Sequence, residues 1–317
     1  MTGKTRGGGA RRDTAGAPWP VLLIVPAGLL GVLLAWALSL PAGFAGQSVA
    51  RVLADGAGAV VLGLAALPRV HAKLSPPWRL LAVLAGFWCG TEFAVLVAEA
   101  AEVLGVPVGG LGAGSFGDYL LDVSGGQVGI AILLGAGAIA CYAALAFRRI
   151  DIAAPDLVLV FAAVTLALRP ITGHMSQHAF GSVLAAVHAL AAAAWFGLLV
   201  ALALVVRTRG TWAVALPRYS AMALPLVAIV AVTGLLNGLI KVGGITPFFD
   251  TGYGRILLAK TVVLLGLLGL GWWWRRSWVG RAADHRVSAD ASLRRAVLEV
   301  VVMALAFGLA ATLAVTA

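Results

Sequence analysis

Charged residues are scarce in this sequence. Asp, Glu, Lys and Arg make up 11% of the 317 residues, whereas 61% are hydrophobic and the mean hydropathy is +1.00. A soluble domain needs more charge to cover its surface, so the composition indicates a protein that crosses a membrane several times. The net charge of +10 does not indicate nucleic-acid binding, because the basic residues form short clusters between apolar runs.

Cysteine is scarce as well. Cys89 and Cys141 lie within apolar runs and form no CxxC pair, which argues against a disulfide framework and a thiolate metal site. We expect both to be buried small apolar side chains. The sequence also lacks strand patterns, P-loops and glycine-rich nucleotide motifs. These absences favour an all-α membrane protein that is not an enzyme.

Nine apolar stretches are long enough to cross a bilayer as helices. They cover residues 19–40, 51–68, 80–103, 127–147, 154–169, 179–206, 219–240, 255–274 and 296–316. Residues 1–17 are Gly-rich and basic, and we expect them to be a disordered cytoplasmic tail. The fifth stretch is the weakest, because its uncharged core is short and flanked by Asp156 and Arg169, which are expected to snorkel.

The positions of the basic residues predict the orientation. With the N-terminus inside, 18 of the 23 Lys and Arg residues fall in cytoplasmic segments, as the positive-inside rule requires. We therefore expect a bundle of about nine transmembrane helices, N-terminus in and C-terminus out. Residues 18–175 would hold helices one to five and residues 176–317 helices six to nine.

Three of the five histidines lie between residues 170 and 206. His174, Met175 and His178 precede the sixth span on its expected outer side, and His188 lies inside it, towards mid-membrane. On one regular helix the three imidazoles would share a face, but about 15 Å would separate His178 from His188, which predicts two stations rather than one cage. Imidazole with a thioether suits copper, and a histidine within a span indicates function. Alternatively, His174 and His178 are solvated loop residues and His188 hydrogen-bonds a neighbouring helix.

Carboxylates also lie within the spans. Glu92 and Glu99 are seven residues apart on the third span and share a face. Charges at this depth need partners, and the expected partners are Arg51, Asp55, Arg255 and Lys260. A buried ion-pair network that fixes helix packing accounts for most of these groups. Glu92, near the bilayer centre, is also a candidate for carrying a proton or contacting a cation.

Other residues of the spans have expected packing roles. Trp195 lies seven residues after His188 on the same face, and we expect it to pack beneath the imidazole and close the site from the cytoplasm. Two close glycine pairs, Gly86 with Gly90 and Gly266 with Gly269, predict surfaces for close helix approach.

Three blocks of the second half resemble the copper resistance protein D (CopD) family, whose members are multi-span inner-membrane proteins implicated in copper uptake. The blocks are His188–Leu198 (HALAAAAWFGL), Arg218–Gly234 (RYSAMALPLVAIVAVTG) and Thr251–Lys260 (TGYGRILLAK). The third is the most specific, and the first departs from the family's Trp-Gly-Gly at Gly197 and Leu198. The resemblance covers about residues 180–316, so the first half inherits no roles from it.

This resemblance implies a copper-handling protein of the bacterial plasma membrane that serves copper import, homeostasis and resistance. The outer copper ligands would be His174, Met175 and His178, and His188 would be the deeper ligand. From their depth and spacing, and not from the resemblance, the possible coupling or pathway residues are Glu92, Glu99, Asp55 and Trp195. The short outer side, without a Met-rich or His-rich tail, predicts that an extracytoplasmic protein delivers the copper.

Two other functions remain open at this point. Histidines in helical bundles also serve as axial haem ligands, so a membrane redox protein is an alternative, although a bis-His site would need a second histidine from another span. An accessory subunit without transport activity is the other.

Overall fold

The computed structural model describes residues 14–41, 43, 46–172, 180–242 and 246–315. Within these ranges the chain forms helices and no β-strand, which confirms the all-α class. The long helices are α1 (Ile24–Ser39), α2 (Gln47–Val70), α3 (Trp78–Val103), α5 (Ser124–Arg148), α6 (Pro155–Thr172), α7 (Gly181–Val205), α8 (Arg209–Val242), α10 (Gly252–Trp274) and α12 (Ala289–Val315). The shorter helices are α4 (Ala113–Asp122), α9 (Pro247–Asp250) and α11 (Gly280–Ala283).

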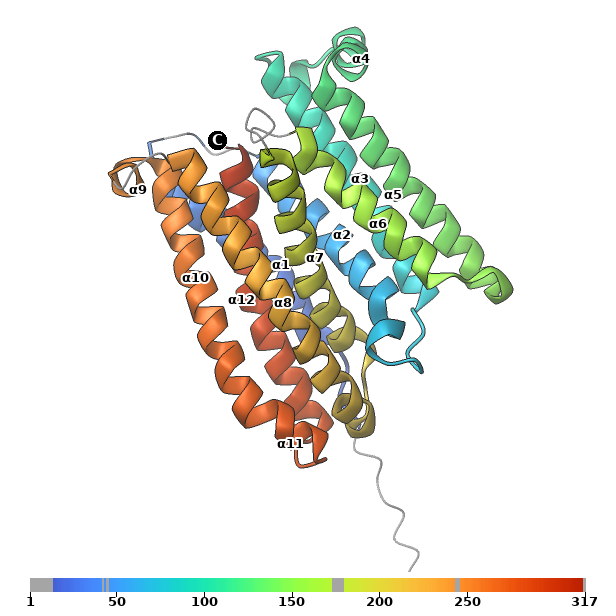
Figure 1. Ribbon diagram of the computed structural model, residues 1–317. Coiled ribbons are helices and arrows are strands. Elements are labelled where there is room, and N and C mark those ends of the chain that lie inside the picture. The colour runs from blue at the N-terminus through green and yellow to red at the C-terminus, as the bar shows by residue number, and fades with distance from the viewer. Residues whose placement is uncertain (1–13, 42, 44–45, 173–179, 243–245, 316–317) are drawn as a thin grey trace, which may run out of the picture.

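Eight helices of the described chain are long and apolar enough to cross a membrane, judged by length and composition. They correspond to all the expected spans except the fifth, so the polytopic architecture is confirmed. The fifth is present as helix α6, 18 residues long, which is not among the eight. It nevertheless packs along α5, α7 and α2 within the bundle (Figure 1). Its membrane crossing stays a prediction.

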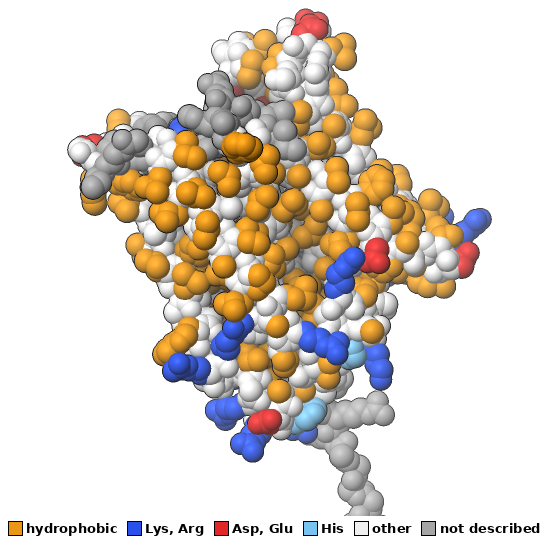
Figure 2. Space-filling model, in the orientation of Figure 1, with side chains coloured by type: hydrophobic (Ala, Val, Ile, Leu, Met, Phe, Trp, Pro, Cys, Tyr) orange, Lys and Arg blue, Asp and Glu red, His pale blue; other side chains and the backbone are white. Residues whose placement is uncertain are grey.

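The described chain begins and ends at opposite ends of the bundle. Thr14 pairs with Thr208 after α7, and the Gly16 N–H donates to the Asp290 carboxylate at the start of α12, at 2.8 Å. From there α12 runs to the other end of the bundle (Figure 1). Lys and Arg side chains gather near the end that carries α11, and apolar side chains cover the middle (Figure 2). This distribution agrees with the expected orientation, which stays a prediction.

α2 and α7 form the middle of the bundle, because glycine lets their backbones touch. A Cβ on Gly63 would lie 2.0 Å from the Gly197 carbonyl oxygen, and a Cβ on Gly197 would lie 1.8 Å from that of Ala59. No larger residue fits either position without moving a helix. On one side α3 and α5 pack together with α6, and on the other lie α1, α8, α10 and α12 (Figure 1).

The glycine pairs expected to pack helices do not do so. A Cβ on Gly86, Gly90, Gly266 or Gly269 would meet no atom of another helix within 4 Å. The expectation was wrong because a pair spacing does not say which face of a helix is covered. The cysteine expectation also fails, since Cys89 is only half-buried and Cys141 is exposed.

Two helices differ from the expected boundaries. α8 begins at Arg209, ten residues before the predicted span, because Pro217 and Pro225 are accommodated inside the helix. A span tolerates proline when neighbouring groups satisfy the freed backbone carbonyls. α4 was not expected, because glycines interrupt its short sequence, yet it buries Tyr119 against Leu96 and Ala100.

Candidate functional site

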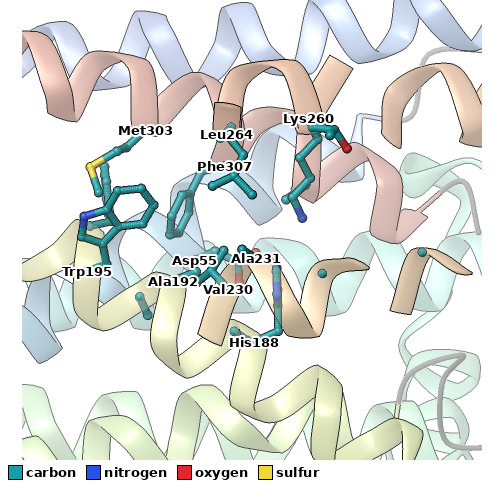
Figure 3. Close-up of a pocket in the computed structure, with 18 of the residues that line it drawn as sticks. Asp55, His188, Ala192, Trp195, Val230, Ala231, Lys260, Leu264, Met303 and Phe307 are labelled. Carbon is teal, nitrogen blue, oxygen red and sulfur yellow. The ribbon is translucent and has the colours of Figure 1, made fainter. Parts of the chain in front are cut away.

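A cavity of about 320 Å³ lies between α2, α6, α7, α8, α10 and α12 (Figure 3). Its walls are mainly alanine, leucine, valine and phenylalanine side chains. The other lining groups that carry chemistry are Arg51, Asp55, Arg169, His188, Trp195, Lys260 and Met303. Helices of both halves of the chain therefore build the site.

His188 lines the cavity, and one of its ring nitrogens is held by a neighbouring helix. Its Nδ1 lies 2.9 Å from the Thr233 hydroxyl, and that hydroxyl donates to the Ile229 carbonyl at 2.5 Å. Because the single hydroxyl proton is used there, Nδ1–H must donate to the Thr233 oxygen. The Val230 carbonyl also interacts with the imidazole, and because a carbonyl oxygen can only accept, it too requires a protonated ring nitrogen. The neutral ring then carries its lone pair on Nε2, the form that binds metals, and no described residue hydrogen-bonds that atom.

The residue after Thr233 makes room for the ring. A Cβ on Gly234 would lie 3.1 Å from the His188 Cε1, closer than most side chains approach. Thr233 therefore orients the imidazole, and Gly234 leaves the space it occupies.

Several cavity groups lie at one depth. His188 is seven residues from Gly181 at the start of α7, while Asp55 and Lys260 are each eight residues from the start of α2 and α10. These helix ends are on the same side of the bundle, so the three groups lie about 10–12 Å below it. Since α7 has 25 residues, His188 lies in the first third of that helix, and its depth in the membrane stays a prediction.

Lys260 and His188 face the cavity from opposite sides, and Met303 lies beside Trp195 at the end of the cavity away from the start of α7 (Figure 3). The Lys260 ammonium forms no hydrogen bond or ion pair with a described residue. Trp195 is 6% exposed and lines the same cavity as His188, as its spacing predicted. Trp195 lies seven residues further along α7 than His188, so its ring is placed to close the cavity on the side away from the start of that helix.

The carboxylates of α3 are held by arginines. Arg169 binds both Glu92 and Glu99, the latter at 2.5 Å, and the Trp88 indole donates to the second Glu92 oxygen at 3.0 Å. Glu92 is 4% exposed, so both oxygens of a buried carboxylate are occupied. Arg169 was expected to snorkel at the end of its helix, which is wrong: the carboxylates draw it inward.

Arg51 extends this network to the cavity. Its guanidinium lies 3.8 Å from Glu99 and 3.9 Å from Asp55. At the outer end of the network, burial together with the Glu99 charge raises the pKa of Tyr119 to about 12, so the phenol stays protonated. Of the expected partners, Arg51 and Asp55 belong to the network.

Arg255 and Lys260 were expected to pair with the carboxylates, and that expectation is wrong. Arg255 donates to the Leu38 carbonyl at 2.7 Å and the Leu40 carbonyl at 3.1 Å, which ties the start of α10 to the end of α1. It therefore has a structural role.

The three expected outer ligands, His174, Met175 and His178, lie outside the described residues. α7 begins at Gly181, and the single face expected to carry all three imidazoles stays a prediction. Among the described residues no three His, Cys, Asp or Glu side chains come together as a closed metal site.

Two groups of this region were not expected from the sequence. Met303 lines the cavity, and Glu299 lies one turn before it on α12. An ionisable residue within the ninth predicted span is by itself a signal of function, and Glu299 meets that description. Met303 gave no signal, because methionine within an apolar run is an ordinary core residue.

Comparison with known families supports the resemblance. Residues 213–313 match the model of the CopD family, described as Copper resistance protein D. The CopD match implies a membrane protein of copper resistance or homeostasis. No curated protein and no solved structure matches the chain.

The structure brings the three CopD-like blocks together. His188 comes from the first block, which precedes the matched residues, while Thr233 and Gly234 end the second and Lys260 ends the third. The second block orients the histidine of the first, and the third supplies the opposite wall. The blocks are far apart in sequence and share one cavity.

Proposed function

We propose that this protein carries copper inward across the plasma membrane, with the cavity as the binding station and His188 as its principal ligand. The observation that carries the proposal is the geometry around His188. The Thr233 hydroxyl fixes the tautomer that leaves a lone pair on Nε2, in a residue that lines the cavity. A histidine whose only role was to hydrogen-bond a neighbouring helix would not need to line a cavity.

Met303 supplies a second ligand of suitable chemistry. Its thioether is soft and its neighbours are apolar, a combination that favours Cu(I). Two ligands of this kind, without a closed cage, suit an ion that is bound in passing and released. His174, Met175 and His178 remain the proposed outer ligands, and an extracytoplasmic copper-delivery protein remains the proposed donor.

The charges around the cavity limit what else can bind. Three basic groups, Arg51, Arg169 and Lys260, are matched by three acidic groups, Asp55, Glu92 and Glu99. A cation that enters the cavity therefore meets charged groups whose sum is zero. One of them, the Lys260 ammonium, has no ionic partner among the described residues. Binding must come from the ligands themselves, which favours a metal bound first by His188 and then by Met303 over a simple alkali cation.

Copper uptake into proteoliposomes tests the proposal. With Cu(I) maintained by a reductant, the parent protein should load the vesicles, and His188→Ala should lower uptake by orders of magnitude, because an ion without its ligand crosses an apolar stretch at a cost of several kcal/mol. His174→Ala and His178→Ala should weaken capture but retain uptake at high copper. His71→Ala, in a connection at the other end of the bundle, is the matched control. A His188→Ala protein that folds and transports like the parent would overturn the proposal.

The same samples address the alternatives. A stoichiometric haem spectrum that disappears in His188→Ala would favour a redox protein. A bis-His haem site would need a histidine from a second span, and the sequence has none in its other predicted spans. Copper bound through His188 without uptake would favour an accessory subunit.

A further inference from the structure

A second polar site lies on the inner side of Trp195. Glu299 of α12 is 8% exposed, and Tyr219 of α8 is 4% exposed. Glu299 lies ten residues from the start of α12, Tyr219 ten from the start of α8, and Trp195 ten from the end of α7. These three helix ends are on the same side of the bundle, so the three side chains lie at one depth, about 15 Å from it.

These side chains lie together. The Tyr219 hydroxyl lies near the Trp195 indole, although not in the geometry of a hydrogen bond, and within range of the Glu299 charge. Glu299 and Met303 are four residues apart on α12 and therefore share a face. Trp195 and Met303 line the inner end of the cavity (Figure 3). The acidic site is thus one helical turn beyond the cavity, towards the end rich in Lys and Arg.

Neither polar group is satisfied within the described protein. Glu299 forms no ion pair and no hydrogen bond with a described residue, and the buried Tyr219 hydroxyl has no hydrogen-bond partner there. Arg295, one turn before Glu299, comes within 4.0 Å of no described carboxylate, and its Nη1 is also buried without a partner. A buried carboxylate kept for packing alone would normally be paired, as Glu92 is.

We infer that Glu299 and Tyr219 form an inner binding station for the copper ion that leaves the cavity past Met303 and Trp195. The inference rests on the proposed function and adds the step after His188. The described charges that line the cavity or pair with its lining balance without Glu299, and its carboxylate, which pairs with no described cation, is the negative charge that an inward-moving cation meets next. Oxygen ligands hold Cu(I) more weakly than imidazole or thioether, so the ion is released rather than stored.

The order of ligands gives a passage in three steps. The imidazole binds the ion in the cavity, the thioether takes it along α12, and the carboxylate receives it beyond the Trp195 ring. Each step is about one or two helical turns, and no atom is oxidised or reduced.

The test separates binding from movement. Glu299→Gln keeps the size of the side chain and removes its charge. It should bind copper in equal amount and with the same affinity as the parent, because His188 and Met303 are intact, while uptake into proteoliposomes falls about tenfold or more. Glu299→Asp, which keeps the charge, should restore part of the uptake. Tyr219→Phe should lower it by a smaller factor.

Glu102→Gln, an exposed carboxylate at the end of α3, is the matched control, and thermal unfolding in detergent checks each variant. If Glu299→Gln transports like the parent, or if it folds but no longer binds copper, the inner station is wrong. If the parent itself takes up no copper, the proposed function fails instead. If Glu299→Gln does not fold, Glu299→Asp and Tyr219→Phe are used instead. Copper uptake equal to that of the parent in both variants would overturn the inference. Lower uptake with unchanged copper binding in either variant would support it.

Discussion

The two sides of the cavity treat buried charge differently. On the side of α2, α3 and α6, Arg169 and Arg51 hold Glu92 and Glu99, and every one of these groups has an opposite charge within 4.0 Å. On the side of α10 and α12, Lys260 and Glu299 have no ionic partner among the described residues. A charge inside a membrane is costly, so the paired groups fit a role in joining helices and the unpaired ones a role in function.

This difference changes which carboxylate is of interest. From the sequence Glu92 was the candidate for coupling, because it lies deepest in its span. Its oxygens are both occupied, by Arg169 and Trp88, and a carboxylate held in this way has little capacity for another cation. Glu299 lies as deep and is unoccupied.

The largest effect is expected on the paired side. Arg169→Met leaves Glu92 and part of Glu99 without a counter-charge, and breaking a buried pair in this way costs about 3–5 kcal/mol. Thermal unfolding in detergent should show a much less stable protein, and Arg169→Lys should be milder because it keeps the charge.

Arg69→Met is the control for this experiment. Arg69 pairs with Asp156 at 2.7 Å, but both side chains are exposed, so its loss should cost only about 0–1 kcal/mol. Equal stability of Arg169→Met and Arg69→Met would show that the network does not hold the helices together.

The sequence predicted the fold well where the signal was local. Apolar length is a property of each segment, so the spans could be placed within a few residues, apart from the starts of α8 and α12, which lie ten and seven residues before the predicted ones. The partners of the charges depend on how helices pack. Nothing in the segment from Pro155 to Arg169 says that its arginine turns towards α3 rather than towards lipid headgroups.

The candidate site was predictable in part for the same reason. His188, Asp55 and Trp195 were expected from their depth and spacing, and all three line the cavity. Met303 could not be found, because its role depends on α12 lying beside Trp195.

A smaller effect is expected on the unpaired side, at Lys260. Its ammonium faces His188 across the cavity and repels a bound cation, so Lys260→Met should tighten Cu(I) binding by about fivefold and leave stability unchanged or improved. Competition with a Cu(I) chelator measures the affinity. Loss of binding in Lys260→Met would instead show that the ammonium holds an anionic companion of the metal.

The smallest effect is expected at Gly234, where only shape changes. A methyl group there would lie 3.1 Å from the His188 Cε1 and would push the imidazole away from Thr233 by a few tenths of an ångström. The hydrogen bond that fixes the tautomer lengthens, and Cu(I) affinity should fall about two- to threefold while the fold is kept. Gly266→Ala is the matched control, because a Cβ at Gly266 meets nothing within 4 Å and should leave affinity unchanged. Chelator competition on both variants is sufficient. Equal affinities for Gly234→Ala and Gly266→Ala would mean that copper binding does not depend on how Thr233 holds the His188 ring.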